Sequence, residues 1–309
     1  MLEIPVLALS DALNLNSEFK LFSQYNNVLN FKNNDNEILG ITDKFDYISP
    51  INVLISEKNF QLLKKYIELK GVIIDLEIKK LGLKIRATDL DKIRLIITFE
   101  TKICSFFVDV QFNYENEDFI LDVIEYFKEV SNNRGLSIIL KIIEGEKIWV
   151  QNIDYKIAYN IYKNFLNLLD LYFKNRDEDF SFDLKNIIGL GRGLTPSGDD
   201  FIIGAILAFH YFFNKKFFDK LSKIIFKISE LNTNLISFNY IKMALNGYFH
   251  NYVKEFLISL NRKSDDIILK IEKIMNIGNS SGIDFLTGFF TTFKIFKILE
   301  VKNEVSKYN

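Results

Sequence analysis

The chain has 309 residues, of which 48% are hydrophobic and 15% are aromatic, so it carries ample apolar surface for a large core. This content excludes an intrinsically disordered protein, because burial of so much apolar surface can offset the entropy of ordering the chain. The 39 basic and 40 acidic residues give a formal net charge of -1, which offers no support for a nucleic-acid-binding or membrane-surface protein.

Cysteine and histidine are too scarce for a zinc site of the usual composition. Cys104 is the only cysteine, which excludes an intrachain disulfide, and His210 and His250 are the only histidines. The N-terminus, MLEIPVLALSDALNLNSEF, lacks the basic stretch of a secretory signal. The longest apolar stretch, Phe201 to Phe213, is shorter than the ~20 residues that cross a bilayer and favours a core helix. We therefore expect a soluble cytoplasmic protein without nucleic-acid or membrane partners.

The first 115 residues are expected to be rich in strands, because short apolar runs alternate there with turn residues. One helix interrupts them at Lys58–Leu69, where apolar side chains recur at helical spacing. The predicted strands are Phe19–Asn30, Ile38–Thr42, Asn52–Ile55, Val72–Glu77, Leu83–Ala87, Arg94–Glu100 and Cys104–Gln111.

After Glu115 the spacing of apolar residues becomes helical. Asp118–Val130 and Ile153–Phe173 are predicted as amphipathic helices. Between them, Gly135–Ile143 is predicted as a helix and Lys147–Gln151 as a short strand. The acidic segment Asn175–Asp183 is expected to be poorly structured.

From Gly198 onward the whole chain is predicted to be helical. The expected helices are Asp199–Phe213, Phe217–Leu231, Leu235–Tyr248, Tyr252–Leu260, Asp265–Met275 and Ile283–Leu299. The fold class is therefore α+β, with a strand-rich, barrel- or sandwich-like domain over residues 1–115 and an all-helical domain over 116–309.

The most distinctive segment is the glycine-rich loop GLGRGLTPSGDD, from Gly189 to Asp200. Glycine permits close approach of the backbone to a ligand, and four of the chain's 14 glycines lie here. They are Gly189, Gly191, Gly193 and Gly198. Thr195 and Ser197 have the chemistry of N-caps for the following helix. Asp199 and Asp200 fall in its first turn, where the helix dipole stabilises negative charge.

Three roles suit this loop. Its free backbone N–H groups can bind a phosphate or carboxylate, since helix N-termini are natural anion sites. Asp199 and Asp200 can hold a magnesium ion, which takes oxygen ligands, or one of them can act as a general base if burial raises its pKa. The simpler alternative is a capped turn with two solvated acids. Neither a Walker loop nor a Rossmann fingerprint fits, because the GK[ST] ending and the third glycine are absent.

Arg192 stands within the loop and is one of six arginines in the chain. A guanidinium at this position can bind phosphate or carboxylate in a bidentate manner, and a solvated side chain is the equal alternative.

A second segment, Ile277–Gly288 (IGNSSGIDFLTG), repeats part of this pattern. Both segments contain Ser-Gly-x-Asp-Phe-x-x-Gly, starting at Ser197 and at Ser281. Each copy places Ser-Gly at a helix entry, an Asp in the first turn and a Gly four residues further on the same face. A glycine inside a helix costs ~1 kcal/mol relative to alanine, so Gly204 and Gly288 are predicted to allow close approach of another backbone.

We therefore predict that the two helices pack together and that Asp200 and Asp284 face a shared ligand in one cleft. Asn279, Ser280, Ser281 and Gly282 would line the second half of that site, as the glycine loop lines the first. The alternative is coincidence between two well-capped helices.

Weaker candidates lie between the two motifs. Asn246-Gly247 interrupts a helical pattern and is expected to be a cap or a turn. Thr233 and Ser237 either line the cleft or cap a helix, and capping is the simpler interpretation. His250 is expected to be partly buried among aromatic residues, and His210 to be a hydrogen-bonded core histidine.

The two motifs carry a family resemblance. GLGxGLTPSGDDF, followed further on by GNSSGIDFLTG, resembles a bacterial family that includes a subunit of oxamate carbamoyltransferase in allantoin degradation. The resemblance extends more faintly through Thr233-x-x-x-Ser237, Ala244-x-x-Gly247 and the strand-rich half. Where the family usually shows GPGLTP, this sequence has Arg192 in place of the proline, which loosens the loop and adds a positive charge.

This resemblance implies a subunit of a multi-component transferase that converts oxalurate and phosphate to oxamate and carbamoyl phosphate in purine catabolism. It implies partner subunits, and it makes the two motifs the site. Asp199, Asp200 and Asp284 would orient a substrate amide or a magnesium ion, and the glycines and hydroxyls would bind anions. A stand-alone magnesium-dependent hydrolase and a non-catalytic anion-binding scaffold remain the alternatives.

Overall fold

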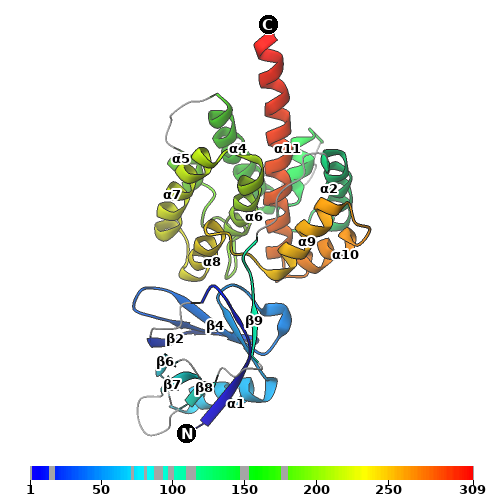
Figure 1. Ribbon diagram of the computed structural model, residues 1–309. Coiled ribbons are helices and arrows are strands. Elements are labelled where there is room, and N and C mark those ends of the chain that lie inside the picture. Colours follow the sequence, from blue (N-terminus) through cyan, green and yellow to red (C-terminus); the bar gives the residue numbers. More distant parts are fainter. Residues whose placement is uncertain are drawn as a thin grey trace. The chain divides into compact units, whose positions relative to one another are not determined.

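A computed structural model of the chain describes residues 2–13, 18–70, 73–79, 82–86, 93–96, 101–108, 116–146, 153–174 and 180–308. The chain divides into two compact units (Figure 1). The β unit comprises Met1–Val108 and Tyr248–Lys254, and the helical unit comprises Asp109–Gly247 and Glu255–Asn309. A strand-rich N-terminal part followed by helices confirms the α+β class. The domain limits expected from the sequence, 1–115 and 116–309, remain a prediction.

The described strands of the β unit form one sheet in the order β7-β6-β2-β3-β4-β5-β1-β8, with β9 also paired to β1. β7 and β8, at the two ends of this order, contact each other, so the sheet takes the barrel-like form of the two that were expected. The strands are β1 (Leu2–Ser10), β2 (Glu18–Gln24), β3 (Val28–Lys32), β4 (Ile38–Thr42), β5 (Asn52–Ile55), β6 (Ile73–Lys79), β7 (Gly82–Arg86), β8 (Ile93–Ile96) and β9 (Lys102–Cys104).

Two strand predictions were wrong, and one strand was missed. The single strand expected at Phe19–Asn30 is a hairpin of β2 and β3, whose turn is closed by Tyr25 N–H donating to Val28 O at 2.9 Å. The strand expected at Cys104–Gln111 is absent over its described part, because β9 ends at Cys104 and only an isolated bridge at Phe107 follows; residues 109–111 lie outside the described residues. β1 was not predicted, although its pairing with β5 on one side and β8 on the other places it within the sheet.

The helix expected at Lys58–Leu69 is α1 (Glu57–Lys70). Its apolar stripe, Phe60, Leu63 and Ile67, is buried with the inward-facing side chains of the sheet in one core. A single β-unit core therefore explains why this helix interrupts the run of strands.

The described helices of the helical unit range from 5 to 28 residues, and most of them lie close to the predicted ranges (Figure 1). They are α2 (Glu117–Ser131), α3 (Ile138–Ile143), α4 (Ile153–Phe173), α5 (Ser181–Lys185), α6 (Ser197–Phe212), α7 (Lys215–Asn232), α8 (Leu235–Leu245), α9 (Asn251–Arg262), α10 (Ile267–Met275) and α11 (Ser281–Tyr308). α9 begins within the segment that belongs to the β unit. The strand expected at Lys147–Gln151 lies outside the described residues, as do residues 175–179 of the acidic segment.

Three helices differ clearly from the predictions, and the largest difference is at α11, which ends at Tyr308 and not at Leu299. α8 ends at Leu245 rather than Tyr248, because Asn246 caps it and Gly247 follows with φ +84°, as the predicted turn requires. α5 begins inside the segment expected to be poorly structured. No helix among the described residues is long and apolar enough to cross a membrane.

Phenylalanine fills much of the helical core. Phe165 on α4 contacts Phe201 and Phe209 on α6, with ring centroids 5.0 and 6.0 Å apart. Phe127 on α2 contacts Phe290 on α11 at 5.3 Å. Because α6 is buried along nearly its whole length, the apolar stretch from Phe201 is the core helix that was predicted.

His210 is hydrogen-bonded, as predicted, but it is not a core residue. It lies exposed near the C-terminal end of α6, where its ring contacts Phe218 at 4.1 Å and Nε2 lies 3.4 Å from Ala244 O. His250 is partly buried, as predicted, and its Nε2 lies 3.2 Å from Asp46 O.

α6 and α11 pack along each other with close backbone contact. A Cβ atom on Gly204 would overlap the carbonyl oxygen of Phe285, and one on Gly288 would overlap that of Phe201. The predicted function of these two interior glycines is therefore confirmed, and the close approach brings the starts of both helices together.

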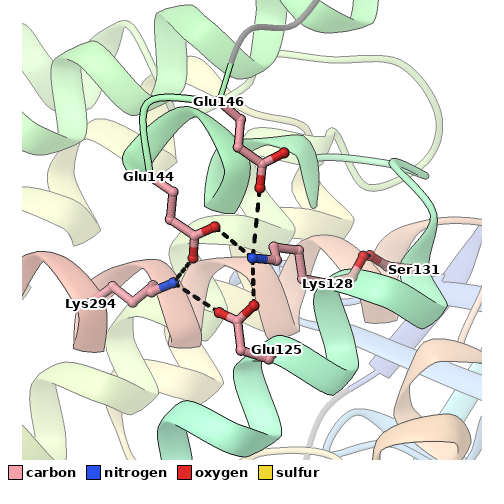
Figure 2. Close-up of polar contacts among 6 residues, drawn as sticks. All are labelled: Glu125, Lys128, Ser131, Glu144, Glu146 and Lys294. Atoms are coloured by element: carbon pink, nitrogen blue, oxygen red, sulfur yellow. Dashed lines mark hydrogen bonds and ion pairs between the residues drawn. The ribbon is translucent and has the colours of Figure 1, made fainter.

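An ion-pair cluster links α2 and α3 to α11 (Figure 2). Lys128 of α2 lies 2.5 Å from both Glu125 and Glu144, and Lys294 of α11 pairs with the same two glutamates. Burial alone would raise the pKa of Glu144, but the hydrogen bonds and charges of Lys128 and Lys294 outweigh it and lower the pKa to about 2. This cluster holds the α2–α3 pair, and hence the connection between these helices, against α11.

Candidate functional site

The start of α6 is capped by the backbone of the glycine loop. The helix begins at Ser197, and Pro196 occupies the N-cap position without a side-chain cap. Gly198 N–H donates to Leu190 O at 2.8 Å, and Asp199 N–H donates to Pro196 O at 2.8 Å. The prediction that Thr195 or Ser197 caps this helix was therefore wrong, because loop carbonyls already satisfy the N–H groups that a side chain would bind.

Asp199 is completely buried, and both of its carboxylate oxygens are bonded to protein groups. Gly189 N–H donates to Oδ1 at 2.7 Å, and the Thr233 hydroxyl donates to Oδ2. Burial raises the pKa of Asp199, and the hydrogen bonds from Thr233 and Gly189 partly oppose that rise. Asp199 thus ties the glycine loop to the junction of α7 and α8.

The capping interpretation is confirmed for Thr233, which is the C-cap of α7 as well as the donor to Asp199, and it is wrong for Ser237, which lies within α8. Asn234 is the N-cap of α8, and its side chain accepts from Ile236 N–H and Ser237 N–H at 3.0 and 3.1 Å. Asn234 also donates to Leu194 O at 2.8 Å, a second bond between this junction and the glycine loop. The sequence offered no signal for Asn234 beyond its N-cap chemistry.

Asp200 is 7% exposed and belongs to a chain of hydroxyl contacts that joins the two helix starts. Thr195 Oγ1 donates to Asp200 Oδ2 at 3.0 Å and lies 2.9 Å from Ser281 Oγ at the start of α11. Burial raises the pKa of Asp200 well above its usual value, and the charge of Asp284 raises it further. The expectation of two solvated acids is therefore wrong.

Asp284 is fully buried, and only one of its oxygens has a hydrogen-bond partner among the described residues. Leu136 N–H donates to Oδ1 at 2.6 Å, whereas Oδ2 is buried and unpartnered. Burial raises the pKa of Asp284 to about 6, and the hydrogen bond from Leu136 N–H only partly opposes this rise. A carboxylate held at one oxygen and open at the other is suited to receive a hydrogen bond from a ligand.

The connection between α2 and α3 is the part of the site that the sequence did not reveal. Gly135 lies there with φ +55°, and a Cβ at this position would overlap Asp284 Oδ1. Asn132 and Asn133 also have positive φ values, of 47° and 60°. The only sequence signal is the run Asn132-Asn133-Arg134-Gly135, which is typical of a turn and says nothing about its contact with Asp284.

The remaining predicted residues occupy the rims of the two motifs. Arg192, Gly193 and Asn279 are exposed, whereas Ser280 and Ser281 are partly buried at the start of α11. The backbone N–H groups from Gly191 to Leu194 make no hydrogen bond with described residues. Gly282 packs so closely against Ile274 that a Cβ would overlap its carbonyl oxygen.

No lysine, arginine or histidine among the described residues forms an ion pair with Asp199, Asp200 or Asp284. In the same described part of the chain, no group of three or more His, Cys, Asp and Glu side chains is arranged to hold a metal ion. The charges of Asp200 and Asp284 therefore act on each other without a neutralising cation from the described residues.

Residues 187–293 match a family model described as oxamate carbamoyltransferase subunit AllH. The matched segment is well under half of the chain, yet it contains both Ser-Gly-x-Asp motifs. This match confirms the family resemblance drawn from those motifs. No solved structure matches the chain.

Proposed function

We propose that this chain, whose residues 187–293 match the AllH family, is a subunit of an oxamate carbamoyltransferase and contributes a substrate site at the starts of α6 and α11. The observation that carries the proposal is that the matched segment contains both motifs, whose two buried aspartates approach each other in the fold. The reaction converts oxalurate and phosphate to oxamate and carbamoyl phosphate. A phosphate oxygen bonds to the carbamoyl carbon, the carbon–nitrogen bond to the oxamate nitrogen breaks, and that nitrogen takes the proton from hydrogenphosphate.

We assign different parts of the site to different parts of carbamoyl phosphate. Arg192 is exposed beside the unbonded N–H groups of Gly191 to Leu194, and together they suit the phosphate group. Asp200 and Asp284 suit the transferred group, and Asp199 serves to hold the loop because both of its oxygens are already bonded. Magnesium remains a candidate only as an ion bound mainly by substrate oxygens.

The proposal is tested by reconstituting the full chain with its partner subunits and measuring carbamoyl phosphate formed from oxalurate and phosphate. We expect no activity from the chain alone and turnover when the partners are added. Asp284→Asn and Asp200→Asn should each lower kcat by about 100-fold, the size of effect seen when one group that stabilises a transition state is removed. Thr291→Val is the control, because Thr291 is also buried on α11 but lies outside the two motifs.

Three outcomes would redirect the proposal. An active complex that retains its rate in both aspartate variants would remove the site from the reaction. Turnover by the chain alone that is lost on chelation would favour a stand-alone magnesium-dependent hydrolase. Thermal stabilisation by phosphate or oxamate without turnover under any condition would favour an anion-binding scaffold.

A further inference from the structure

Most backbone N–H groups at the two helix starts are already hydrogen-bonded within the protein. At α6, the N–H groups of Gly198, Asp199 and Asp200 all donate to loop carbonyls, at 2.8 to 3.2 Å. At α11, Gly282 N–H donates to Ile277 O at 3.1 Å and Asp284 N–H donates to Ser280 O at 2.8 Å. Among the described residues, only Ser197 N–H at α6 and Ser281 and Ile283 N–H at α11 keep no hydrogen bond, so most of the anion site that helix N-termini usually provide is already occupied by protein carbonyls.

What remains between the two helix starts is a pair of carboxyl groups and the hydroxyls of Thr195 and Ser281. Asp200 and Asp284 are both buried and have no ion-pair partner among the described residues. Two buried acids without a cation would repel an anionic group, because Coulomb repulsion is poorly screened away from water. The same pair can bind a neutral group that carries hydrogen-bond donors.

Asp200 and Asp284 differ in their capacity to donate and accept hydrogen bonds. Leu136 N–H occupies Oδ1 of Asp284, so its buried Oδ2 is the open acceptor. Burial and the charge of Asp284 raise the pKa of Asp200 well above its usual value, which favours the protonated form that can donate. The Thr195 hydroxyl, which is bonded to Asp200 at 3.0 Å and lies 2.9 Å from Ser281 Oγ, places this donor side at the start of α11. One acceptor beside one donor matches the N–H and C=O groups on one edge of a primary carboxamide.

We infer that the Asp200–Asp284 pair recognises the NH2–C=O group of a carbamoyl or carboxamide ligand, with Asp284 Oδ2 accepting from the amide and Asp200 donating to its carbonyl oxygen. The inference rests on the proposed function for the identity of that ligand. It reverses the expectation that this part of the site binds an anion, and it leaves the anionic part of the substrate to the exposed rim that carries Arg192.

Oxamate and oxalate are matched probes, because oxalate replaces only the NH2 group of oxamate with an oxygen. Calorimetric titration of the full chain at pH 7, alone and with its partner subunits, should show oxamate binding at least about tenfold more tightly than oxalate, which corresponds to one hydrogen bond and a relieved repulsion. Asp284→Asn should abolish this preference, since an asparagine side chain no longer supplies an ionised acceptor. Thr291→Val should keep it.

Equal or tighter binding of oxalate, an unchanged preference in Asp284→Asn, or no oxamate binding in either state would overturn the inference. Circular dichroism of Asp284→Asn checks that it folds, and Ser281→Ala provides a second variant that should weaken oxamate binding if the first does not fold. A failure of the proposed function can be distinguished from a failure of this inference. If the reconstituted complex transfers no carbamoyl group but the chain still prefers oxamate, only the proposed function fails. If the complex is active but the chain shows no preference for oxamate, only the inference fails.

Discussion

The starts of α6 and α11 share one local sequence and occupy two different environments. Asp200 at the first start is bonded to Thr195 and lies beside the charge of Asp284. Asp284 at the second start is bonded to Leu136 N–H through one oxygen and has its other oxygen buried and open. The repeated motif therefore explains why the two helices pack, whereas the surrounding residues give each aspartate its own chemistry.

The two helix starts are alike in their packing and different in their electrostatics. Gly204 and Gly288 act equivalently, since each would clash with the backbone of the other helix if it carried a Cβ. The aspartates do not act equivalently, because their hydrogen-bond donors come from different connections, Thr195 in the glycine loop and Leu136 between α2 and α3. Substitutions at the glycines test the packing, and substitutions at the acids and their donors test the electrostatics.

The largest effect is expected at the interior glycines. Gly204→Ala and Gly288→Ala should each destabilise the protein by about 3 kcal/mol, because the new Cβ overlaps backbone atoms that cannot move independently. Helix propensity alone predicts the opposite sign, a gain of ~1 kcal/mol. Urea unfolding followed by circular dichroism measures the change, and stabilisation by either substitution would show that the helices do not pack this closely.

The second-largest effect is expected in the pH dependence of the free energy of unfolding that arises from Asp284. Because its pKa is raised from 3.8 to about 6, the folded state binds a proton more tightly than the unfolded state, and stability falls as pH rises through that window. Asp284→Asn should therefore be more stable than the unsubstituted chain at pH 7, by about 2 kcal/mol after allowance for relaxation. The two proteins should converge toward pH 4 in denaturant titrations, and a constant difference would contradict the raised pKa.

Removal of the Thr233 hydroxyl, which donates to Asp199, tests whether Asp199 has a structural function. Thr233→Val should destabilise the protein by about 1 to 2 kcal/mol, because a buried carboxylate oxygen loses its donor. Ligand affinity should change little once the loss of stability is allowed for. A binding defect as large as that of Asp284→Asn would instead place Asp199 among the ligand-contacting groups.

The smallest effect is expected in the ion-pair cluster of Figure 2, and its pH dependence has the opposite sign. The pKa of Glu144 is lowered to about 2, so its contribution is present above pH 4.5 and is lost as pH falls toward 2. Glu144→Gln should cost about 1 kcal/mol at pH 7, with a difference that shrinks in acid. Thermal unfolding across this range measures it, and a difference that grows in acid would be inconsistent with the lowered pKa.

The sequence by itself determined the features that depend on neighbours along the chain. Apolar spacing placed most helices within a few residues, because helical periodicity is a local property. The repeated Ser-Gly-x-Asp motif located both helix starts, and the interior glycines indicated close packing before any contact was known. The turn between Tyr25 and Val28, which divides the strand predicted at Phe19–Asn30, is an equally local feature that the strand prediction missed.

Only the tertiary structure decided which polar groups meet. Nothing near Asp284 in the sequence indicated that Leu136 would supply its hydrogen bond, and nothing near Asp199 singled out Thr233 as its donor. The start of α6 was also predicted to be an anion site, but the carbonyl groups of Leu190 and Pro196 accept hydrogen bonds from three of its N–H groups. The physical reason is that hydrogen-bond partners and burial, which together set the pKa of each aspartate, come from segments that folding brings together from distant parts of the chain.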